Sequence, residues 1–394
     1  MVSTNVAAGQ QVIVRAASPE EARLLRALVE AGKGEIVVDL PLIDGFAATV
    51  TPQALASLRA VDDSITVVPD STVTLTEPEM PERGDWNLQV ATATLKLPQI
   101  WDKGFKGKGI GIAVIDTGVA PHPDFGSRIV GFHDRINWRT DPYDDRGHGT
   151  HVAGIAAGDG SASGGKYCGA APEANIIGIK VMDQNGKGQL SDIIAGLQWA
   201  VENKQTYNIR VINMSLGAKP EVPLKRDPLV AAVEKANEAG ILVVAAAGNK
   251  GPYPNTIDTP ATSPAALTVG ATIDYRTPDL GDDKVAWYSG TGPTSFDRLV
   301  KPDVIAPGTY IVSTWTDGGY KKDTGTSMAA PLVAGAAALL IDARPETTPE
   351  ELRQVLRETS QKIRSYDENI QGKGVVRPLA SLESLMPQPE PVAH

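Results

Sequence analysis

From about residue 85 onward, short apolar runs alternate with longer segments that have helical periodicity. The runs are continuous stretches of Val, Ile and Ala, which is typical of strands buried on both faces of a parallel sheet. Parallel strands need crossover connections, and helices supply them, so this order predicts a three-layer α/β domain with a mostly parallel central sheet. We expect strands at 109–115, 176–181, 211–214, 242–246, 267–271 and 311–314. We expect helices at 148–157, 190–202, 228–239, 327–343 and 349–358.

The first 76 residues have a different order of elements and are expected to form a small α+β domain. A strand over 11–15 precedes a helix that begins at Ser18-Pro19, where Ser is a good N-cap and Pro fits the first helical position. Two further strands, a second helix from Thr51 to about Arg59 and an extended segment ending near Thr76 follow. The order β-α-β-β-α-β is that of a ferredoxin-like fold.

A polar, proline-rich segment with the sequence EPEMPERG occupies residues 77–84 and marks the best domain boundary. The predicted division is a small domain over 1–76, a linker over 77–84, a larger domain over 85–384 and a Pro-rich tail over 385–394.

Composition excludes several classes of partner. The chain has 394 residues and a formal net charge of −10, without a basic patch that contains aromatic residues, so nucleic acid is not an expected partner. No apolar stretch is long and charge-free enough to span a bilayer, so no membrane partner is expected. Cys168 is the only cysteine, which leaves no internal disulfide. Residues 1–10 lack the apolar run of a secretory signal.

The segment GTSMAAP, residues 325–331, opens the longest apolar helix and places the hydroxyl of Ser327 at its N-terminus. Unpaired backbone N–H groups and the helix dipole favour negative charge developing on a substrate oxygen there. Pro331 is expected in the first turn, where its missing N–H costs little. Taken alone, Ser327 also fits a plain N-cap.

Three other polar residues follow strands or begin helices in the way that a catalytic site needs. Asp116 ends an apolar strand, His148 begins a helix between two glycines, and Asn249 follows another strand. Each also has an ordinary interpretation as a turn, cap or surface residue. His148 and His151 lie three apart and match a metal pair, but neither a Glu nor a third ligand falls at the expected spacing.

Together, Asp116, His148, Asn249 and Ser327 meet the requirements of acyl transfer. Ser327 is the candidate nucleophile, His148 the general base and Asp116 the group that orients the imidazole. The Asn249 amide and the Ser327 backbone N–H would form the oxyanion hole.

The segments AVIDTG (113–118), HGTHVAG (148–154), AAGN (246–249) and GTSMAAP resemble those of the subtilisin-like serine proteases (subtilases, peptidase S8). The resemblance covers about residues 86–380 and implies a serine endopeptidase that acts through an acyl-enzyme. The runs HPD (122–124), YDDRGH (143–148) and GAAPEAN (169–175) are similar to the AprX type, described as intracellular. With the polar N-terminus, this favours the cytoplasm; secretion is the alternative.

The resemblance also implies where a substrate binds. Residues Gly186, Lys187 and Gly188 would flank an extended peptide on one side, and Ser215, Leu216 and Gly217 on the other. Residues Ala245, Ala246 and Gly248 would line a roomy apolar pocket, which predicts a preference for apolar residues before the scissile bond.

By the same resemblance, the N-terminal domain is expected to be a propeptide, an intramolecular chaperone and inhibitor that the enzyme removes itself. Self-cleavage would fall between about Leu75 and Asp85, and the bonds before Pro78 and Pro81 are excluded. The alternative is an accessory domain that stays attached.

No cofactor is expected for the chemistry, and structural calcium is the candidate metal. Asp124 matches a family calcium ligand, but residues 159–169 replace the family's Asn-rich calcium loop and offer few oxygen ligands. Asp141, Asp144 and Asp145 form either another site or a solvated acidic loop.

Two other functions remain open from the sequence. An esterase would use the same triad, although no G-x-S-x-G elbow surrounds Ser327. A catalytically silent peptide-binding module is disfavoured because every catalytic residue is present.

Overall fold

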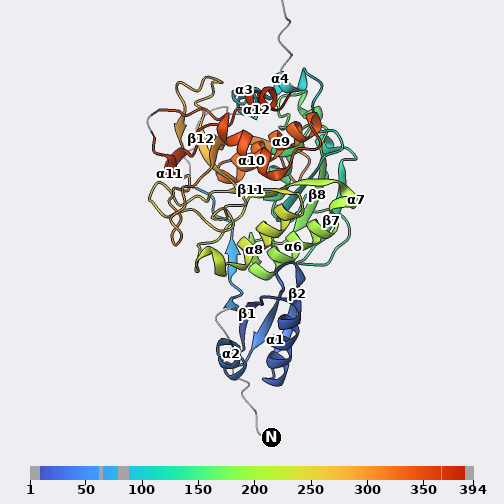
Figure 1. The fold of residues 1–394 in the computed structure, drawn as a ribbon. Coiled ribbons are helices and arrows are strands. Elements are labelled where there is room, and N and C mark those ends of the chain that lie inside the picture. Colours follow the sequence, from blue (N-terminus) through green and yellow to red (C-terminus); the bar gives the residue numbers. More distant parts are fainter. Residues whose placement is uncertain (1–8, 62–64, 79–87, 365, 387–394) are drawn as a thin grey trace, which may run out of the picture.

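The computed structural model describes residues 9–61, 65–78, 88–364 and 366–386 (Figure 1). Most of the predicted linker and of the predicted tail lies outside these described residues.

A mostly parallel sheet forms the centre of the larger part of the chain, as the sequence predicts. The strand order is β13-β12-β11-β10-β6-β8-β7, and β14 pairs with β12. Every pairing is parallel except that of β12 with β13. The strands are β6 (Gly111–Asp116), β7 (Ile129–Asp134), β8 (Asn175–Lys180), β10 (Ile209–Met214), β11 (Leu242–Ala246), β12 (Leu267–Ile273), β13 (Lys284–Val285) and β14 (Val304–Pro307).

The strand expected at 311–314 exists but is not part of this sheet. It is β15 (Ile311–Thr314), which pairs with β16 (Tyr320–Asp323) in a separate antiparallel hairpin. In this sheet, the sequence analysis missed β7, β14 and the two-residue strand β13. Residues of β7 are mixed in burial, and β14 has only four residues, so neither gives the continuous apolar run of a central strand.

Helices cover both faces of the sheet. Helices α5 (His148–Ala157) and α9 (Thr326–Ala343) pack on one face, and α6 (Leu190–Glu202) and α8 (Pro228–Glu238) on the other. Alternate residues of β6 serve the two faces: Ile112 and Val114 join the first core, Ala113 and Ile115 the second. The remaining helices are α3 (Leu88–Thr94), α4 (Leu97–Trp101), α7 (Lys204–Tyr207), α10 (Pro349–Glu358), α11 (Glu368–Gln371) and α12 (Pro378–Leu385).

Helix α9 differs from two expectations. Its length and composition would let it cross a membrane, but 89% of the helix is buried, as in the core helix of a globular domain, so this is weak evidence for a membrane span. Pro331 lies inside the helix, not in its first turn. A proline there cannot donate to the carbonyl four residues earlier, that of Ser327. The Ser215 hydroxyl donates to this carbonyl at 2.8 Å instead.

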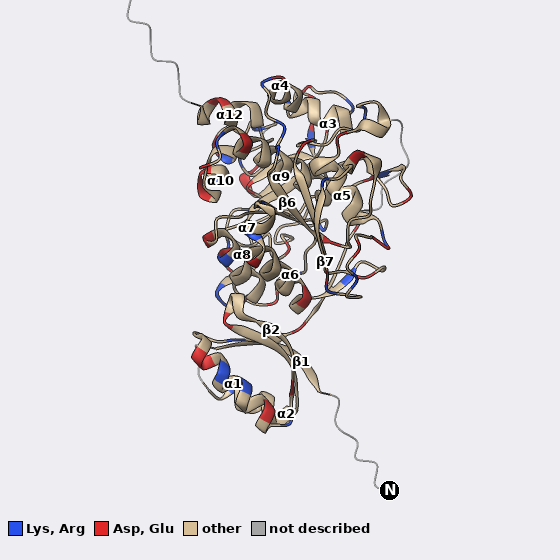
Figure 2. Cartoon of the chain, turned by 90° about the vertical axis from the view of Figure 1, so that its right-hand side faces the viewer, with Lys and Arg blue, Asp and Glu red and all other residues tan. Residues whose placement is uncertain are grey.

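The N-terminal unit is a four-stranded antiparallel sheet with two helices, in strand order β2-β3-β1-β4. Its helices and one sheet face enclose a small core, while Ile13, Ala47 and Val68 join the core that contains α6 and α8. Figures 1 and 2 show the unit below these two helices. The elements are β1 (Gln10–Arg15), α1 (Pro19–Ala31), β2 (Glu35–Leu40), β3 (Gly45–Val50), α2 (Pro52–Arg59) and β4 (Thr66–Pro69).

The last strand of this segment leaves the unit and enters the larger part of the chain. Strand β5 (Thr72–Thr74) pairs antiparallel with β9 (Lys187–Gln189).

In Figure 2, acidic and basic residues are interspersed over both parts of the molecule.

Candidate active site

The four candidate residues lie at strand ends and helix starts. Asp116 is the last residue of β6, and His148 is the first of α5. Asn249 follows β11 by three residues, and Ser327 is the second residue of α9. The carboxyl ends of parallel strands meet at one edge of a sheet, which is where open α/β sheets carry their sites.

Asp116 and His148 form a buried pair. Asp116 Oδ1 lies 2.8 Å from His148 Nδ1, and the two residues are 0% and 3% exposed. With Nδ1–H directed at the carboxylate, Nε2 is the nitrogen left for a substrate-side proton. Burial is the largest single effect and opposes the charged imidazolium, but Asp116, Asp323 and Glu77 together outweigh it and raise the pKa of His148 to about 9.

The turn before His148 is built by a glycine and an aspartate. Gly147 has φ +100°, and a Cβ there would lie 2.4 Å from Trp315. The buried Asp144 carboxylate accepts hydrogen bonds from Gly147 N at 2.8 Å and Thr150 N at 2.9 Å. Asp144 is therefore a cap of helix α5, which corrects both interpretations of the acidic loop for this residue.

Asp145 also has a structural partner. Its Oδ1 lies 2.7 Å from Nζ of Lys180, which is fully buried and donates to the carbonyls of Thr117 and Met182 as well. These bonds satisfy all three ammonium protons. Asp145 thus pairs with a buried cation through Oδ1.

The Ser327 hydroxyl donates to the carbonyl oxygen of Ser215 at 3.2 Å. Within the described residues, no hydrogen bond joins Ser327 to His148, the residue that the sequence analysis assigns as its general base. Such contacts are often loose until the reacting complex forms. Ser215 is held in turn by Asn213, whose Nδ2 donates to its hydroxyl at 2.9 Å.

Both polar atoms of the Asn249 side chain have hydrogen-bond partners. Its Oδ1 accepts hydrogen bonds from the backbone N and the hydroxyl of Thr326, at 2.9 and 3.0 Å. Its Nδ2 donates to the carbonyl oxygen of Thr76 at 2.6 Å. Gly325 leaves room for this amide, because a Cβ there would lie 3.1 Å from Asn249 Nδ2.

The predicted substrate-binding segments lie beside the residues that precede Thr76. Lys187 and Gly188 belong to β9 and pair with Thr74 and Val73 of β5. The Gly186 carbonyl accepts from Leu75 N at 2.9 Å. Residues of the opposite segment share a small cavity with the end of the strand. That cavity is lined by Leu75, Thr76, Ser215, Leu216, Gly217, Ala246, Gly248, Asn249, Asp258, Thr326 and Ser327.

Two details of this pocket differ from the expectation. Ala245 is not among the lining residues but lies in the core with α6 and α8. Asp258, which the sequence analysis missed, is 4% exposed and lines the pocket, so the pocket is not purely apolar. Burial raises the pKa of Asp258, while Lys250 Nζ lies 3.1 Å from its Oδ1.

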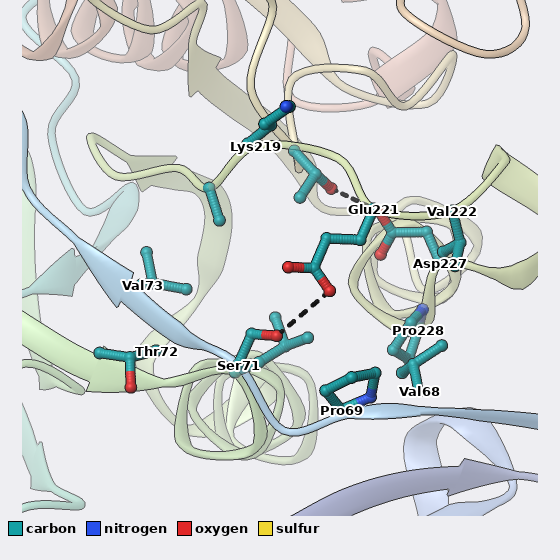
Figure 3. Close-up of a pocket in the computed structure, with 13 residues that line it drawn as sticks. Val68, Pro69, Ser71, Thr72, Val73, Lys219, Glu221, Val222, Asp227 and Pro228 are labelled. Carbon is teal, nitrogen blue, oxygen red and sulfur yellow. Dashed lines mark hydrogen bonds between the residues drawn. The ribbon is translucent and has the colours of Figure 1, made fainter.

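A second cavity lies where β4 and β5 meet the loop after β10. Val68, Ser71 and Val73 form one wall, and Glu221 and Val222 face them (Figure 3). The Ser71 hydroxyl donates to Glu221 at 3.4 Å across this seam. The cavity continues the line of the strand away from Ser327.

The two histidines of the candidate metal pair have separate partners. His148 contacts Asp116, and His151 Nε2 lies 2.9 Å from the carbonyl oxygen of Lys321. Burial lowers the pKa of His151 to about 4, so this imidazole is neutral at ordinary pH. Over the described ranges, no group of three or more His, Cys, Asp or Glu is arranged to hold a metal.

The surroundings of Asp124 do not fit calcium. Its Oδ1 accepts from Ala162 N and its Oδ2 from the Tyr320 hydroxyl, both at 2.8 Å. The Arg128 guanidinium donates to three nearby carbonyls, those of Asp124, Ala157 and Ala174. Calcium needs six to eight free oxygen ligands, and here N–H and O–H donors use these oxygens.

Comparison with known proteins identifies relatives of this chain by sequence. Residues 107–374 match the model of the subtilase family, peptidase S8. Serine protease AprX of Bacillus subtilis (strain 168) is 45% identical over 289 residues, which are 68% of this chain and 65% of AprX. Subtilisin E of the same organism is 34% identical over 331 residues, 83% of this chain and 78% of that protein. The matched part spans less than two thirds of AprX, and 37% of the minor extracellular protease Epr.

Solved structures give the same result for the fold. The S41 psychrophilic protease has a TM-score of 0.60 and 34% identity, over 69% of this chain and 92% of that chain. A cold adapted subtilisin-like serine proteinase has a TM-score of 0.56, also at 34% identity.

Proposed function

The chain belongs to the subtilase family of serine proteases, which are hydrolases, and we propose that it is a serine endopeptidase made with an N-terminal inhibitory unit. The observation that carries this proposal is the 2.6 Å hydrogen bond from Asn249 Nδ2 to the Thr76 carbonyl. A peptide carbonyl lies where an amide donor would stabilise an oxyanion, beside a serine at a helix start and a histidine paired with a carboxylate.

In the proposed reaction, Ser327 Oγ attacks a peptide carbonyl carbon while His148 takes the hydroxyl proton. Asp116 keeps the imidazole oriented and stabilises its charged form. The developing oxyanion is bound by Asn249 Nδ2 and the Ser327 backbone N–H. The C–N bond then breaks as His148 gives its proton to the leaving amine. Water hydrolyses the acyl-enzyme by the same steps, which releases a carboxylate and restores Ser327.

The N-terminal unit is proposed to be the propeptide, with a boundary after residue 76 and the catalytic domain over 85–384. Its observed strand order is that of a ferredoxin-like fold. Support comes from the burial of Ile13, Ala47 and Val68 against the catalytic core and from the strand β5 in the substrate groove. An inhibitor that occupies the groove as an added strand blocks other peptides from the same site.

The preference before the scissile bond follows from the pocket. The residue in this position is Thr76, and the lining combines Ala246 and Leu216 with the carboxyl group of Asp258. We expect a residue of modest size there, in place of the large apolar residue that the sequence suggests.

Mass spectrometry of the purified full chain tests the proposal. Wild type is expected to be shortened at its N-terminus and to digest casein, with digestion abolished by a fluorophosphonate. Ser327→Ala should stay intact and inactive, whereas Ser57→Ala, an exposed serine of α2, should behave as wild type. Asn249→Ala should slow casein digestion by about 10²–10³-fold. A folded wild-type protein that never cleaves casein would instead be a silent peptide-binding module.

A further inference from the structure

The strand that enters the active site has a defined register. Thr72, Val73 and Thr74 pair with Gln189, Gly188 and Lys187, and the next residue, Leu75, donates to the Gly186 carbonyl. A slip by one residue would move Val73, which is 1% exposed, to the opposite face of the strand. The ladder therefore determines which carbonyl reaches Asn249.

That carbonyl belongs to Thr76. It accepts from Asn249 Nδ2 at 2.6 Å, and Thr76 lines the same cavity as Ser327. The bond directly after it joins Thr76 to Glu77, and Glu77–Pro78 follows. Because the oxyanion donor contacts the carbonyl of the bond to be cut, the reacting bond is the one after Thr76.

The residue after this bond has its own partner. Arg146 Nη2 lies 2.7 Å from Glu77 Oε1, with the two side chains 27% and 46% exposed. The Arg146 backbone N donates to Asp144 at 3.1 Å, so the arginine is held by the residue that caps α5. Arg146 lies two residues before His148 in the sequence, and its partner Glu77 is one of the charges that act on the His148 imidazole.

The arginine also has unused binding capacity. Its Nε is buried and has no hydrogen-bond partner within the described part of the chain. A guanidinium offers five N–H donors in a planar fork that suits a carboxylate. Glu77 pairs with Nη2 of this fork, so a carboxylate after the cleaved bond makes a charge-assisted contact that a neutral side chain would make more weakly.

We propose that the enzyme cleaves its own chain at Thr76–Glu77 and that Arg146 is a specificity-determining residue that binds an acidic side chain directly after the cleaved bond. The proposal rests on the endopeptidase function. Self-cleavage consumes one water, breaks the Thr76–Glu77 C–N bond, and leaves a carboxylate on Thr76 and an amine on Glu77. The same recognition applies to substrates in which an acidic residue follows a small one.

Sequencing the N-terminus of the processed wild-type protein tests the bond. The expected first residue is Glu77. A processed enzyme that begins elsewhere and still digests casein overturns this assignment and leaves the endopeptidase function intact. A folded chain that neither processes itself nor digests casein contradicts the function itself.

Peptides that contain the junction test the arginine. Three peptides, TVTLT followed by EPEM, QPEM or KPEM, are compared by kcat/KM with the processed enzyme. Partly exposed ion pairs contribute up to about 1 kcal/mol, so the wild type should favour Glu over Gln by about three- to fivefold and disfavour Lys.

The variants Arg146→Gln and Arg146→Glu complete the test. The Glu/Gln ratio should fall to about one in the first, and the second should favour the Lys peptide. Arg139→Gln, an exposed arginine of the same loop, is the control and should keep the wild-type ratio. Because each ratio is taken within one enzyme, a general loss of activity does not change it. A wild-type ratio near one, or an unchanged ratio in both Arg146 variants, overturns the proposal.

Discussion

At the scale of single residues, the proposed reaction depends on the protonation of His148, because only a neutral imidazole can accept the proton of Ser327. In the uncleaved chain, the pKa of this imidazole is raised to about 9, because the effect of burial is outweighed by Asp116, Asp323 and Glu77. The imidazolium therefore persists up to about pH 9, whereas the stability that its pairing with Asp116 contributes is full below pH 6.5 and is lost progressively as pH rises from 6.5 to about 9.

Self-cleavage is accordingly expected to be slow at pH 7 and to accelerate up to about pH 9, since only the neutral imidazole accepts the serine proton. Gel analysis of freshly refolded full chain at several pH values measures the rate. Glu77→Gln should shift the midpoint to lower pH, because it removes one of the charges that raise the pKa. A rate that does not change between pH 6.5 and 10 would contradict this account.

A second residue-scale prediction concerns Asp283, which is fully buried. Neither of its carboxylate oxygens has a partner within the described residues, and burial, with Asp274, Asp282 and Asp279, raises its pKa to about 8. A carboxyl whose folded-state pKa is raised stabilises the fold fully below pH 4, and this contribution is lost as pH rises toward 8.

Asp283→Asn should therefore raise the melting temperature relative to its parent, and more at pH 8 than at pH 5. The gain at pH 8 should be on the order of 3 °C, which corresponds to about 1 kcal/mol in a domain of this size. Both proteins should carry Ser327→Ala, so that self-digestion does not distort the measurement. An equal difference at the two pH values would show that ionisation of Asp283 is not the cause.

At the scale of elements, the start of α5 links stability to catalysis. Asp144 accepts from Arg146 N, Gly147 N, Thr150 N and the Thr150 hydroxyl, at 2.7 to 3.1 Å. Removing this cap with Asp144→Ala should cost about 2 kcal/mol of unfolding free energy, the upper range for an N-cap. It should also lower kcat/KM, because His148 begins the same helix.

Denaturant unfolding and peptide kinetics on Asp144→Ala measure the two effects. Asp141→Ala, an exposed aspartate of the same loop, is the control and should change neither. If the Asp144 variant lost stability but kept full kcat/KM, the cap would not be needed to position the histidine.

Elements with a clear pattern could be predicted from the sequence, and α5, α6 and α10 have the expected ends. Sequence patterns gave wrong predictions where contacts between distant segments determine the local structure. Pro331 is tolerated inside α9 because Ser215, distant in sequence, binds the carbonyl that the proline cannot. Strand β15 has the apolar run of a sheet strand but pairs only with β16.

The site was predictable to a similar extent. Asp116, His148, Asn249 and Ser327 stand in segments with recognisable residue types at strand ends and helix starts. Arg146, Asp258 and Thr76 gave no such signal, because their roles depend on which distant segments lie beside them. Asp144 did carry a signal: an acid before a helix start is a common cap.

At the scale of the whole molecule, the contacts that hold the N-terminal unit include its sheet, β5 and the partly buried carboxylate of Asp70. Asp70 accepts from the backbone N and the hydroxyl of Ser191, at 2.9 and 2.7 Å, at the start of α6. The apolar run of β1 does not alternate with polar residues, as it would in a strand with one exposed face. This pattern is consistent with the burial of Ile13 on the second face of the sheet.

Asp70→Ala should weaken the hold of the cleaved unit by about 5- to 30-fold, because one helix cap is worth roughly 1–2 kcal/mol. Gel analysis reports the cut, and peptide hydrolysis reports the release of the unit. The variant should cut at the wild-type rate and become active sooner afterwards. Glu20→Ala on the outer helix α1 is the control, and an unchanged interval in the Asp70 variant would contradict the prediction.

The hydrogen bond between Asn249 and Thr76 has a consequence for other chains with the same arrangement. If the chain cleaves itself as proposed, the segment around residue 76 has to fit the cleft of every molecule that matures, so its sequence is an example of an accepted substrate. The side chains on either side of that bond can change only together with the groups that receive them. Comparing the residues on either side of the cleaved bond with the residue two before the histidine therefore gives a first prediction of substrate preference for any chain with this arrangement.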